Sequence, residues 1–305
     1  MGGDFAPVFQ AAIGQEPFIA ADQSGRDQGC CKVHNLCLAE PLAIEHCFHL
    51  VSRGPQAILR FKGAQTMPNP TAAMLVIGDE ILSGRTRDAN MHHLAGALTA
   101  QGIDLKEVRV VGDKPDVIVA TVQALAKTYD HLFTSGGIGP THDDITADCI
   151  AAAFGRHIDV RADARALLAE FYANSGRELN EARLRMARIP DGADLIDNPV
   201  SVAPGFTLEN VHVMAGVPSV FQAMVASVLP TLTGGAPLVS ETLKVMRGEG
   251  DIAGPLGDIA AEFDDLSFGS YPFQQDGVYG ANLVVRGTNT ARLAQAISRL
   301  KDAFE

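Results

Sequence analysis

The sequence predicts an α/β protein in which a mainly parallel sheet carries helices on both faces, a three-layer α/β/α sandwich. The first observation is a regular alternation of short apolar runs with longer helical patterns from Ala73 to about Leu232. The second is that glycine and proline fall between these segments, where strands and helices end. The third is a change of pattern after Gly234, which predicts a second, smaller α+β domain.

Each element of the larger domain has a start or stop signal. Buried strands are expected at 73–77 (AMLVI) and 131–134 (HLFT), and a further strand is expected at 105–111 (LKEVRVV). Helices are expected at 88–102, between Asp88 and Gly102, at 114–129, with Pro115 in the first turn, and at 145–155, closed by Gly155. Residues 160–190 are rich in Ala, Leu, Arg and Glu and predict further helices. Short strands around APGF (203–206) and NVHVMAG (210–216), then a helix over 218–232, complete the domain.

The domain boundaries follow from composition. Residues 1–66 show no sustained period of two or of 3.6, so we expect a poorly ordered N-terminal extension. Pro68 and Pro70 mark the start of a domain over 67–233. The sequence GGAP (234–237) predicts a linker to a βαββα unit over 238–305. Its strands are expected at 241–247, 267–274 and 281–287, and its helices at 255–263 and 290–304.

Composition restricts the classes of function. The formal charge of −12 argues against a nucleic-acid-binding face, which needs clustered basic residues. An acidic protein that handles phosphates usually needs a metal cation between itself and its ligand. No apolar run approaches the length of a membrane span, and the first residues lack the basic start of a secretory signal. We therefore expect a cytoplasmic protein that binds neither nucleic acid nor membranes.

Four of the five cysteines lie in the first fifty residues, together with three histidines. The cluster consists of Cys30, Cys31, Cys37 and Cys47 with His34, His46 and His49. Its spacing contains no paired C-x-x-C motif and therefore does not favour a zinc site. Disulfides are equally disfavoured in a cytoplasmic chain. Cys149 falls in a helical apolar pattern and is expected in the core.

The segment TSGGIGPTHDDIT (134–146) places three glycines and a proline before two adjacent aspartates, between a predicted strand and a predicted helix. In open parallel sheets, ligands bind beyond the carboxyl ends of the strands. Glycines there let backbone N–H groups approach a phosphate, and the helix N-terminus favours an anion. No lysine follows the glycines, so the segment is not a P-loop, and it does not match the dinucleotide fingerprint. It predicts a phosphate site that depends on a cation.

Carboxylates follow three successive predicted strands. Asp79 and Glu80 follow the first strand, Asp113 the second, and Asp143 and Asp144 the third. If the strands are parallel, all three loops lie on one edge of the sheet, where Mg²⁺ could be held against diphosphate oxygens. Taken singly, each carboxylate could instead cap a helix or lie in a solvated turn. His142, beside the aspartates, could be a ligand, a general base or neither.

Five motifs carry a resemblance to a known family. The motifs IGDEILSG, VVGD, SGGIGPTHDDIT, RIPDGADLIDNPVSVAPGF and MAGVPSVFQAM occur here in that order, over about Ala73 to Leu232. They resemble the CinA-type molybdopterin-binding domain of the MoaB, MogA and gephyrin-G-like family. The tail from about Val239 resembles the small KH-like middle domain of CinA proteins, without a GxxG loop or a basic face. The chain ends before the nicotinamide-nucleotide amidase domain expected in full-length CinA proteins.

The resemblance implies a three-layer α/β/α fold, a homo-oligomer and roles for individual residues. Asp113 and Asp144 would be the catalytic carboxylates, and Asp79, Glu80, Asp143 and Asp144 the metal ligands. Gly136, Gly137, Gly139, Thr141, Thr146, Asn90, Asn198, Gly205, Gly216 and Pro218 would bind the substrate and its phosphates. Val200-Ser201, where many relatives have glycine nearby, and Ala215, where they have LPGVP, depart from the family pattern and bear on substrate identity.

The resemblance and the predicted site imply three alternative functions. The first, implied by the resemblance to CinA-type domains and to a related domain of eukaryotic FAD synthases, is a metal-dependent pyrophosphatase that cleaves a nucleotide diphosphate of the ADP-ribose or FAD type with Mg²⁺, Mn²⁺ or Co²⁺. The second is molybdopterin binding or adenylyl transfer, because MogA-like members adenylylate molybdopterin with Mg-ATP. The third is a non-catalytic module that binds a small pterin or nucleotide. The two catalytic functions centre on a diphosphate linkage, which suits the predicted site.

Overall fold

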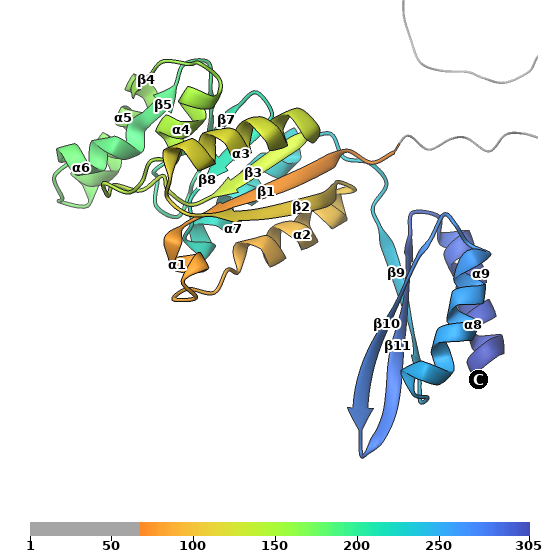
Figure 1. The fold of residues 1–305 in the computed structure, drawn as a ribbon. Coiled ribbons are helices and arrows are strands. Elements are labelled where there is room, and N and C mark those ends of the chain that lie inside the picture. Colours follow the sequence, from red (N-terminus) through yellow and green to blue (C-terminus); the bar gives the residue numbers. More distant parts are fainter. Residues whose placement is uncertain (1–67) are drawn as a thin grey trace, which may run out of the picture. The chain divides into compact units, whose positions relative to one another are not determined.

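The computed structural model describes residues 68–305 (Figure 1). The extension predicted at 1–66, with its cysteines and histidines, lies outside these described residues. Within them, no helix is both long and apolar enough to cross a membrane. Two domains, each with its own sheet and core, are described in turn below.

A six-stranded sheet in the order β2-β1-β3-β8-β7-β6 forms the centre of the larger domain. Its strands are β1 (Thr71–Ile77), β2 (Asp104–Val111), β3 (His131–Ser135), β6 (Asp194–Ile196), β7 (Gly205–Leu208) and β8 (Val211–Met214). The first three and β8 run parallel, and β7 and β6 add an antiparallel edge. The prediction of a mainly parallel sheet is confirmed.

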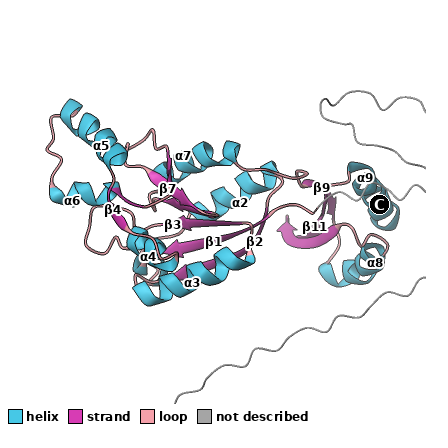
Figure 2. Cartoon of the chain, turned by 90° about the horizontal axis from the view of Figure 1, so that it is seen from above, coloured by secondary structure: helices cyan, strands magenta, loops and turns pink. Residues whose placement is uncertain are grey.

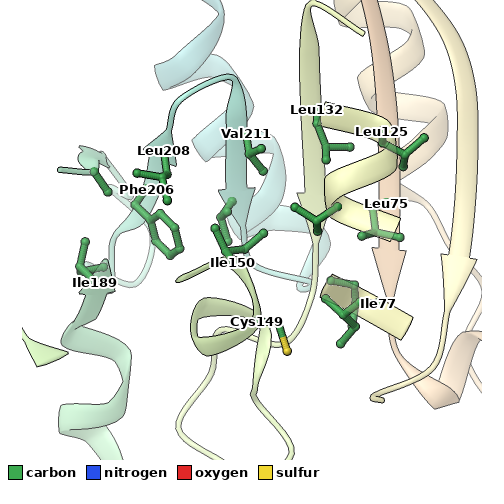
Figure 3. Close-up of a cluster of buried hydrophobic side chains, with 14 of the residues drawn as sticks. Leu75, Ile77, Leu125, Leu132, Cys149, Ile150, Ile189, Phe206, Leu208 and Val211 are labelled. Carbon is green, nitrogen blue, oxygen red and sulfur yellow. The ribbon is translucent and has the colours of Figure 1, made fainter. Parts of the chain in front are cut away.

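Strand β1 is buried on both faces, which explains its unbroken apolar run. Ala73, Leu75 and Ile77 contribute to one core cluster, while the alternate residues Met74 and Val76 contribute to the other. Figure 3 shows Leu75 and Ile77 within the first cluster. Since successive side chains of a strand point to opposite faces, β1 requires a helix layer on each side.

The helices supply these two layers, as Figure 2 shows from above. On one face lie α3 (Pro115–Thr128), α4 (Thr146–Ala153) and α5 (Ala162–Asn174), which bring Leu125, Ile150, Cys149 and Leu168 to the first cluster. On the other lie α2 (Asn90–Gln101) and α7 (Pro218–Val228), which bring Leu94, Phe221 and Met224 to the second. The three-layer α/β/α prediction is confirmed, and Cys149 lies in the core as expected.

The all-helical prediction for 160–190 is wrong in part. Besides α5 and the short helices α6 (Glu181–Leu184) and η1 (Arg185–Ala187), this region contains two three-residue strands. They are β4 (Ile158–Val160) and β5 (Arg188–Pro190), which pair antiparallel. Ile189 of β5 is buried in the first core cluster, so long-range packing determines a conformation that local composition does not indicate.

Two further boundaries differ from the predictions. A short helix, α1 (Asp79–Leu82), follows β1 where a turn was expected. The helix predicted over 218–232 ends at Val228 and continues as a 3₁₀ turn, η2 (Leu229–Thr231). Pro230 lies in that turn and has no backbone N–H to donate, so the α-helical hydrogen bonds stop there.

The smaller domain has the predicted βαββα order. Its elements are β9 (Val239–Val245), α8 (Glu249–Ala261), β10 (Ser267–Gln275), β11 (Val278–Gly287) and α9 (Thr290–Phe304). The three strands form an antiparallel sheet in the order β10-β11-β9, which packs with the helices around buried residues such as Leu283 and Leu300. Helix α8 begins six residues before its predicted start, so Pro255 lies inside it.

The central position of β1 makes Leu75 a test of the fold. Leu75 is fully buried, so Leu75→Ala is expected to lower the free energy of unfolding by about 2–5 kcal/mol. Leu167→Ala removes the same atoms from a side chain that is 41% exposed and should change it by less than about 0.5 kcal/mol. Urea denaturation followed by circular dichroism measures both, and equal effects would contradict the described packing.

Candidate functional site

The candidate site lies at the carboxyl edge of the parallel strands. The glycine loop, residues 136–140, connects β3 to the segment before α4. Gly136 (φ 108°) and Gly137 (φ 70°) both have left-handed backbone conformations. A Cβ atom on Gly136 would lie 2.3 Å from the Ile77 carbonyl oxygen, and one on Gly137 would lie 2.1 Å from Thr146 Oγ1. Only glycine allows the loop to pack this closely against the end of β1 and the start of α4.

Thr146, the first residue of α4, holds the glycine loop in place through hydrogen bonds. It is fully buried, and its hydroxyl donates to the Gly136 carbonyl oxygen at 2.9 Å. Its backbone N–H donates to the Gly137 carbonyl oxygen, also at 2.9 Å. Thr146 was predicted to bind substrate, and in the structure its hydroxyl holds the loop.

Asp144 closes the loop on its other side. Its Oδ2 accepts hydrogen bonds from the backbone N–H of Thr141 at 2.7 Å and from the Thr141 hydroxyl. The same carboxylate would lie 2.6 Å from a Cβ atom on Gly139. The guanidinium of Arg185 donates to the Asp144 carbonyl oxygen at 3.1 Å. Asp144 therefore brings a carboxylate to the site and also stabilises the conformation of the loop through its hydrogen bonds.

Three backbone N–H groups of the loop remain available. Among the described residues, those of Gly137, Ile138 and Gly139 have no hydrogen-bond acceptor. All three residues line a cleft of about 360 Å³. Successive free N–H groups beside a helix N-terminus form a favourable environment for an anion such as a phosphate.

The cleft lies between the glycine loop, the loop that follows β6 and the loop between β8 and α7. Its charged lining residues are Glu80 and Asp144, and its apolar ones include Met186, Val217 and Val220. Such a mixture of apolar walls and a few polar groups is typical of a small-molecule site. The cleft has room for more than a phosphate group.

Asp113 and Asp79 join the ends of β2 and β1. The backbone N–H of Asp79 donates to Asp113 Oδ2 at 3.0 Å. Gly112 leaves room for this approach, because a Cβ atom there would lie 2.3 Å from Asp79 Oδ1. Partial burial raises the pKa of Asp113, and the negative charges of Asp79, Glu80 and Asp143 raise it further, against the lowering effect of the Asp79 N–H. The predicted carboxylates thus affect one another electrostatically.

These carboxylates do not form a ready-made metal cage. Within residues 68–305, no group of three or more His, Cys, Asp or Glu side chains lies close enough to hold a metal ion. Glu80 and Asp144 line the cleft, whereas Asp79 and Asp113 do not. His142 is almost fully exposed, with its Nδ1 3.9 Å from Asp143 Oδ1, and does not line the cleft either.

The remaining predicted residues divide into three groups. Asn198 lines the cleft and organises its loop, accepting from the backbone N–H groups of Val200 and Ser201 and donating to the Ala203 carbonyl oxygen. Gly216 lines the cleft, and Pro218 begins α7 beside it. Gly205 does not line the cleft and lies in β7, where a Cβ atom would be 2.4 Å from a backbone oxygen of β8.

Sequence reasoning missed Arg185. Arg185 lines a crevice beside the main cleft together with Gly137, Gly139 and Asp144, and its Nε is buried without an acceptor among the described residues. It supplies a positive charge next to the free N–H groups of the loop. Nothing in the surrounding sequence ELNEARLRMARIP distinguishes it from four other nearby charged residues, because only the fold brings it to the loop.

An open α/β sheet with a glycine loop and a cleft at its carboxyl edge defines a small-molecule-binding domain. Residues 73–234 match the family model described as a probable molybdopterin binding domain, which covers more than half of the chain. The chain therefore belongs to the molybdopterin-binding domain family, as the sequence motifs predicted. Residues 237–305 match a second model, described as the middle domain of FAD synthase.

The chain is also similar to individual proteins and to a solved structure. A probable FAD synthase of Caenorhabditis elegans is 31% identical over 79% of this chain, which spans about half (51%) of that protein's length. A protein of Archaeoglobus fulgidus is 32% identical over 65% of this chain and 84% of its own length. The solved structure of CinA, with unknown function, from Thermoplasma acidophilum is 32% identical, covers 53% of this chain and 98% of its own, and has a TM-score of 0.49.

Gly137 tests the packing of the glycine loop. Gly137→Ala adds a methyl group 2.1 Å from Thr146 Oγ1 at a left-handed position, so the loop must shift. Gly155→Ala is a matched control, because Gly155 has a similar φ of 61° and open space around it. The control should cost about 1 kcal/mol of unfolding free energy, and Gly137→Ala at least about 2 kcal/mol, measured by urea denaturation. Equal costs would contradict the close contact with Thr146.

The raised pKa of Asp113 predicts a pH-dependent effect on stability. A carboxyl group whose pKa is higher in the folded state contributes stability below its unfolded pKa of about 3.9, and that contribution is lost as the pH rises through the folded pKa. Asp113→Asn keeps an acceptor for the Asp79 N–H and should therefore raise the melting temperature at pH 7, by about 2–4 °C at most, but not at pH 3.

Asp130 provides a control of opposite sign. Its Oδ2 accepts hydrogen bonds from the backbone N–H and the hydroxyl of Thr71, which lower its pKa. That stability is present above the unfolded pKa and is lost as the pH falls through the folded pKa. Asp130→Asn should therefore lower the melting temperature at pH 7. If both variants shift it in the same direction, the electrostatic account of Asp113 is wrong.

Proposed function

We propose that the larger domain binds a dinucleotide through its diphosphate and hydrolyses that linkage with the help of a divalent cation. The observation that carries this proposal is the row of free backbone N–H groups at Gly137, Ile138 and Gly139, on a cleft that also contains Glu80 and Asp144. Such N–H groups suit the non-bridging oxygens of a diphosphate. The neighbouring carboxylates suit a cation that would be shared between protein and ligand.

The residues present fit a hard divalent cation. Mg²⁺ is usually held by only one or two carboxylates, with waters and substrate phosphates completing its shell, so a cage of three protein carboxylates is not required. The mutual effect of the carboxylates on the pKa of Asp113 indicates negative charge that a cation would relieve. Glu80 and Asp144 would hold the ion, since both line the cleft. A bound Mg²⁺, Mn²⁺ or Co²⁺ would supply charge neutralisation and an activated water.

The protein residues have distinct tasks in this proposal. The N–H groups of the glycine loop bind the diphosphate and stabilise the charge that develops on it. Arg185 adds positive charge behind the loop. A water oxygen forms a bond to one phosphorus atom, the bond from that phosphorus to the bridging oxygen breaks, and two monophosphates leave. Asp113 does not line the cleft, so its proposed role is to accept the proton released by the attacking water through a second water molecule, a role that its raised pKa favours.

FAD is the favoured substrate. The order of the two matched models along the chain, with the molybdopterin-binding domain followed by the FAD synthase middle domain, supports this choice. The named relative in Caenorhabditis elegans, a probable FAD synthase, supports it as well. ADP-ribose carries the same adenosine diphosphate half and is the alternative substrate.

Molybdopterin is a second candidate ligand. The family model is described by that ligand, and the apolar part of the cleft, which includes Met186, Val217 and Val220, could face a flat ring system. Binding of molybdopterin, with or without adenylyl transfer from ATP, would use the same phosphate loop. A module that binds one of these ligands without turnover is the non-catalytic form of the same proposal.

Hydrolysis is tested with the full chain and FAD or ADP-ribose, in Mg²⁺, Mn²⁺ or Co²⁺. We expect AMP as one product, with FMN from FAD or ribose 5-phosphate from ADP-ribose, separated by liquid chromatography. Asp144→Asn keeps an acceptor for Thr141 but removes a negative charge from the cleft, and should lower the rate by about 100-fold.

Asp302→Asn is the matched control for this experiment. Asp302 lies in α9 of the smaller domain and is exposed, so the same chemical change there should leave the rate unchanged. No AMP from either substrate with any of the three cations would refute the hydrolase proposal. Binding of molybdopterin under those conditions would then favour the second candidate.

A further inference from the structure

Asn90, the first residue of α2, has a buried side chain whose carboxamide is only partly used. The residue is 3% exposed. Its Nδ2 donates to Ser135 Oγ at 2.8 Å and to the Gly216 carbonyl oxygen at 2.8 Å. Its Oδ1 has no hydrogen-bond partner in the described part of the chain. A buried acceptor left unpaired is destabilising, so such a group calls for a partner that the described part of the protein does not supply.

The two neighbours fix the orientation of the carboxamide. The Gly216 carbonyl oxygen can only accept, so the nitrogen of Asn90 must face it. Rotating the carboxamide by 180° would bring two oxygens together and lose this bond. The oxygen therefore remains the free atom, whatever the direction of the Ser135 hydroxyl hydrogen.

Asn90 lines a cavity of about 60 Å³ that adjoins the main cleft. Glu80 and Gly216 line both spaces, so a ligand in the cleft borders the cavity as well. Asp88 and Arg87 also line the cavity. One oxygen of Asp88, Oδ2, accepts from the backbone N–H of Met91, which leaves the other available.

The chemistry of the cavity differs from that of the glycine loop. The loop offers N–H donors, whereas the residues that line the cavity include Asn90, Glu80 and Asp88, which carry oxygen acceptors, and one arginine, Arg87. Phosphate ester oxygens are acceptors at neutral pH and would find no proton on the Asn90 oxygen. A hydroxyl or amino group of a ligand can donate a hydrogen bond to that oxygen.

We propose that Asn90 is a specificity-determining residue whose Oδ1 accepts a hydrogen bond from an O–H or N–H group on the part of the ligand beyond the diphosphate. This inference rests on the proposed use of the cleft for a phosphate-bearing ligand. It narrows the role expected for Asn90, binding of the substrate and its phosphates, to recognition of a donor group. The donor can be a sugar or ribityl hydroxyl, or the amino group of a pterin ring.

The test compares ligands that contain such a donor with one that does not. The full chain is titrated by calorimetry with FAD, ADP-ribose, pterin and inorganic pyrophosphate, without added cation and with Ca²⁺. In Asn90→Leu, the affinity for at least one donor-bearing ligand should fall by about tenfold, because one hydrogen bond is lost. The affinity for pyrophosphate should change by less than about twofold. Loss with pterin would identify an amino donor on the pterin ring, and loss confined to FAD and ADP-ribose would identify a sugar or ribityl hydroxyl or the adenine amino group.

Two further variants separate recognition from structure. Ser135→Ala removes a partner of Asn90 Nδ2 without touching Oδ1, and should leave the ratio of FAD to pyrophosphate affinity unchanged. Asn90→Asp retains an acceptor oxygen and should therefore lower the ratio of FAD affinity to pyrophosphate affinity less than Asn90→Leu does. This comparison remains informative even if Asn90→Leu does not fold.

The inference is overturned if Asn90→Leu lowers the affinities for pyrophosphate and for the donor-bearing ligands equally, or if it changes none of these affinities. It is also overturned if the wild-type chain binds none of the four ligands. Failure of the proposed hydrolysis gives a different result. In that case FAD would bind with the expected dependence on Asn90 but would release no AMP in the presence of Mg²⁺, Mn²⁺ or Co²⁺.

Discussion

The close packing of the glycine loop at the end of β3 is the constraint on which the site depends. A side chain on Gly136 would collide with the carbonyl oxygen of Ile77, and one on Gly137 with the hydroxyl of Thr146. Because both residues have left-handed backbones, the chain turns sharply into α4, and the carbonyl groups of Gly136 and Gly137 are bound by Thr146. The N–H groups that follow are left free beside the cleft.

Charge is the second determinant of the site. The chain is acidic overall, and three carboxylates near the carboxyl edge of the sheet, those of Asp79, Glu80 and Asp143, add to the effect of partial burial in raising the pKa of Asp113. Arg185 lines the crevice beside the cleft and donates to the Asp144 carbonyl oxygen, whereas Arg188 of the same crevice pairs with Asp148. A diphosphate brings more negative charge, so a divalent cation offers the most direct compensation. The proposed chemistry depends on this balance more than on any single residue.

Much of the fold follows from local sequence signals. The two-sided burial of β1, the glycine that ends α2 and the proline that begins α3 were all predictable, because each reflects a local conformational preference. The strands β4 and β5 were not, since three residues carry too little local signal and their pairing joins positions about thirty residues apart. Pro230 ends α7 early for a local reason that the helical pattern concealed.

The site was predictable in outline and not in detail. Parallel strand ends correctly indicated that the loops bearing Asp79, Asp113 and Asp144 share one edge of the sheet. The sequence could not show that the Thr146 hydroxyl binds the glycine loop, or that Arg185 approaches this loop from a distant segment. It also could not show which atom of Asn90 lacks a partner. These properties depend on side-chain geometry between segments that only the folded chain brings together.

A crystal structure of the full chain with ADP-ribose tests the central claim most directly. The account predicts that the diphosphate lies against the backbone N–H groups of Gly137, Ile138 and Gly139, with Glu80 and Asp144 on the same side of the ligand. A diphosphate bound elsewhere on the molecule, or no ligand density at saturating concentration, would contradict it.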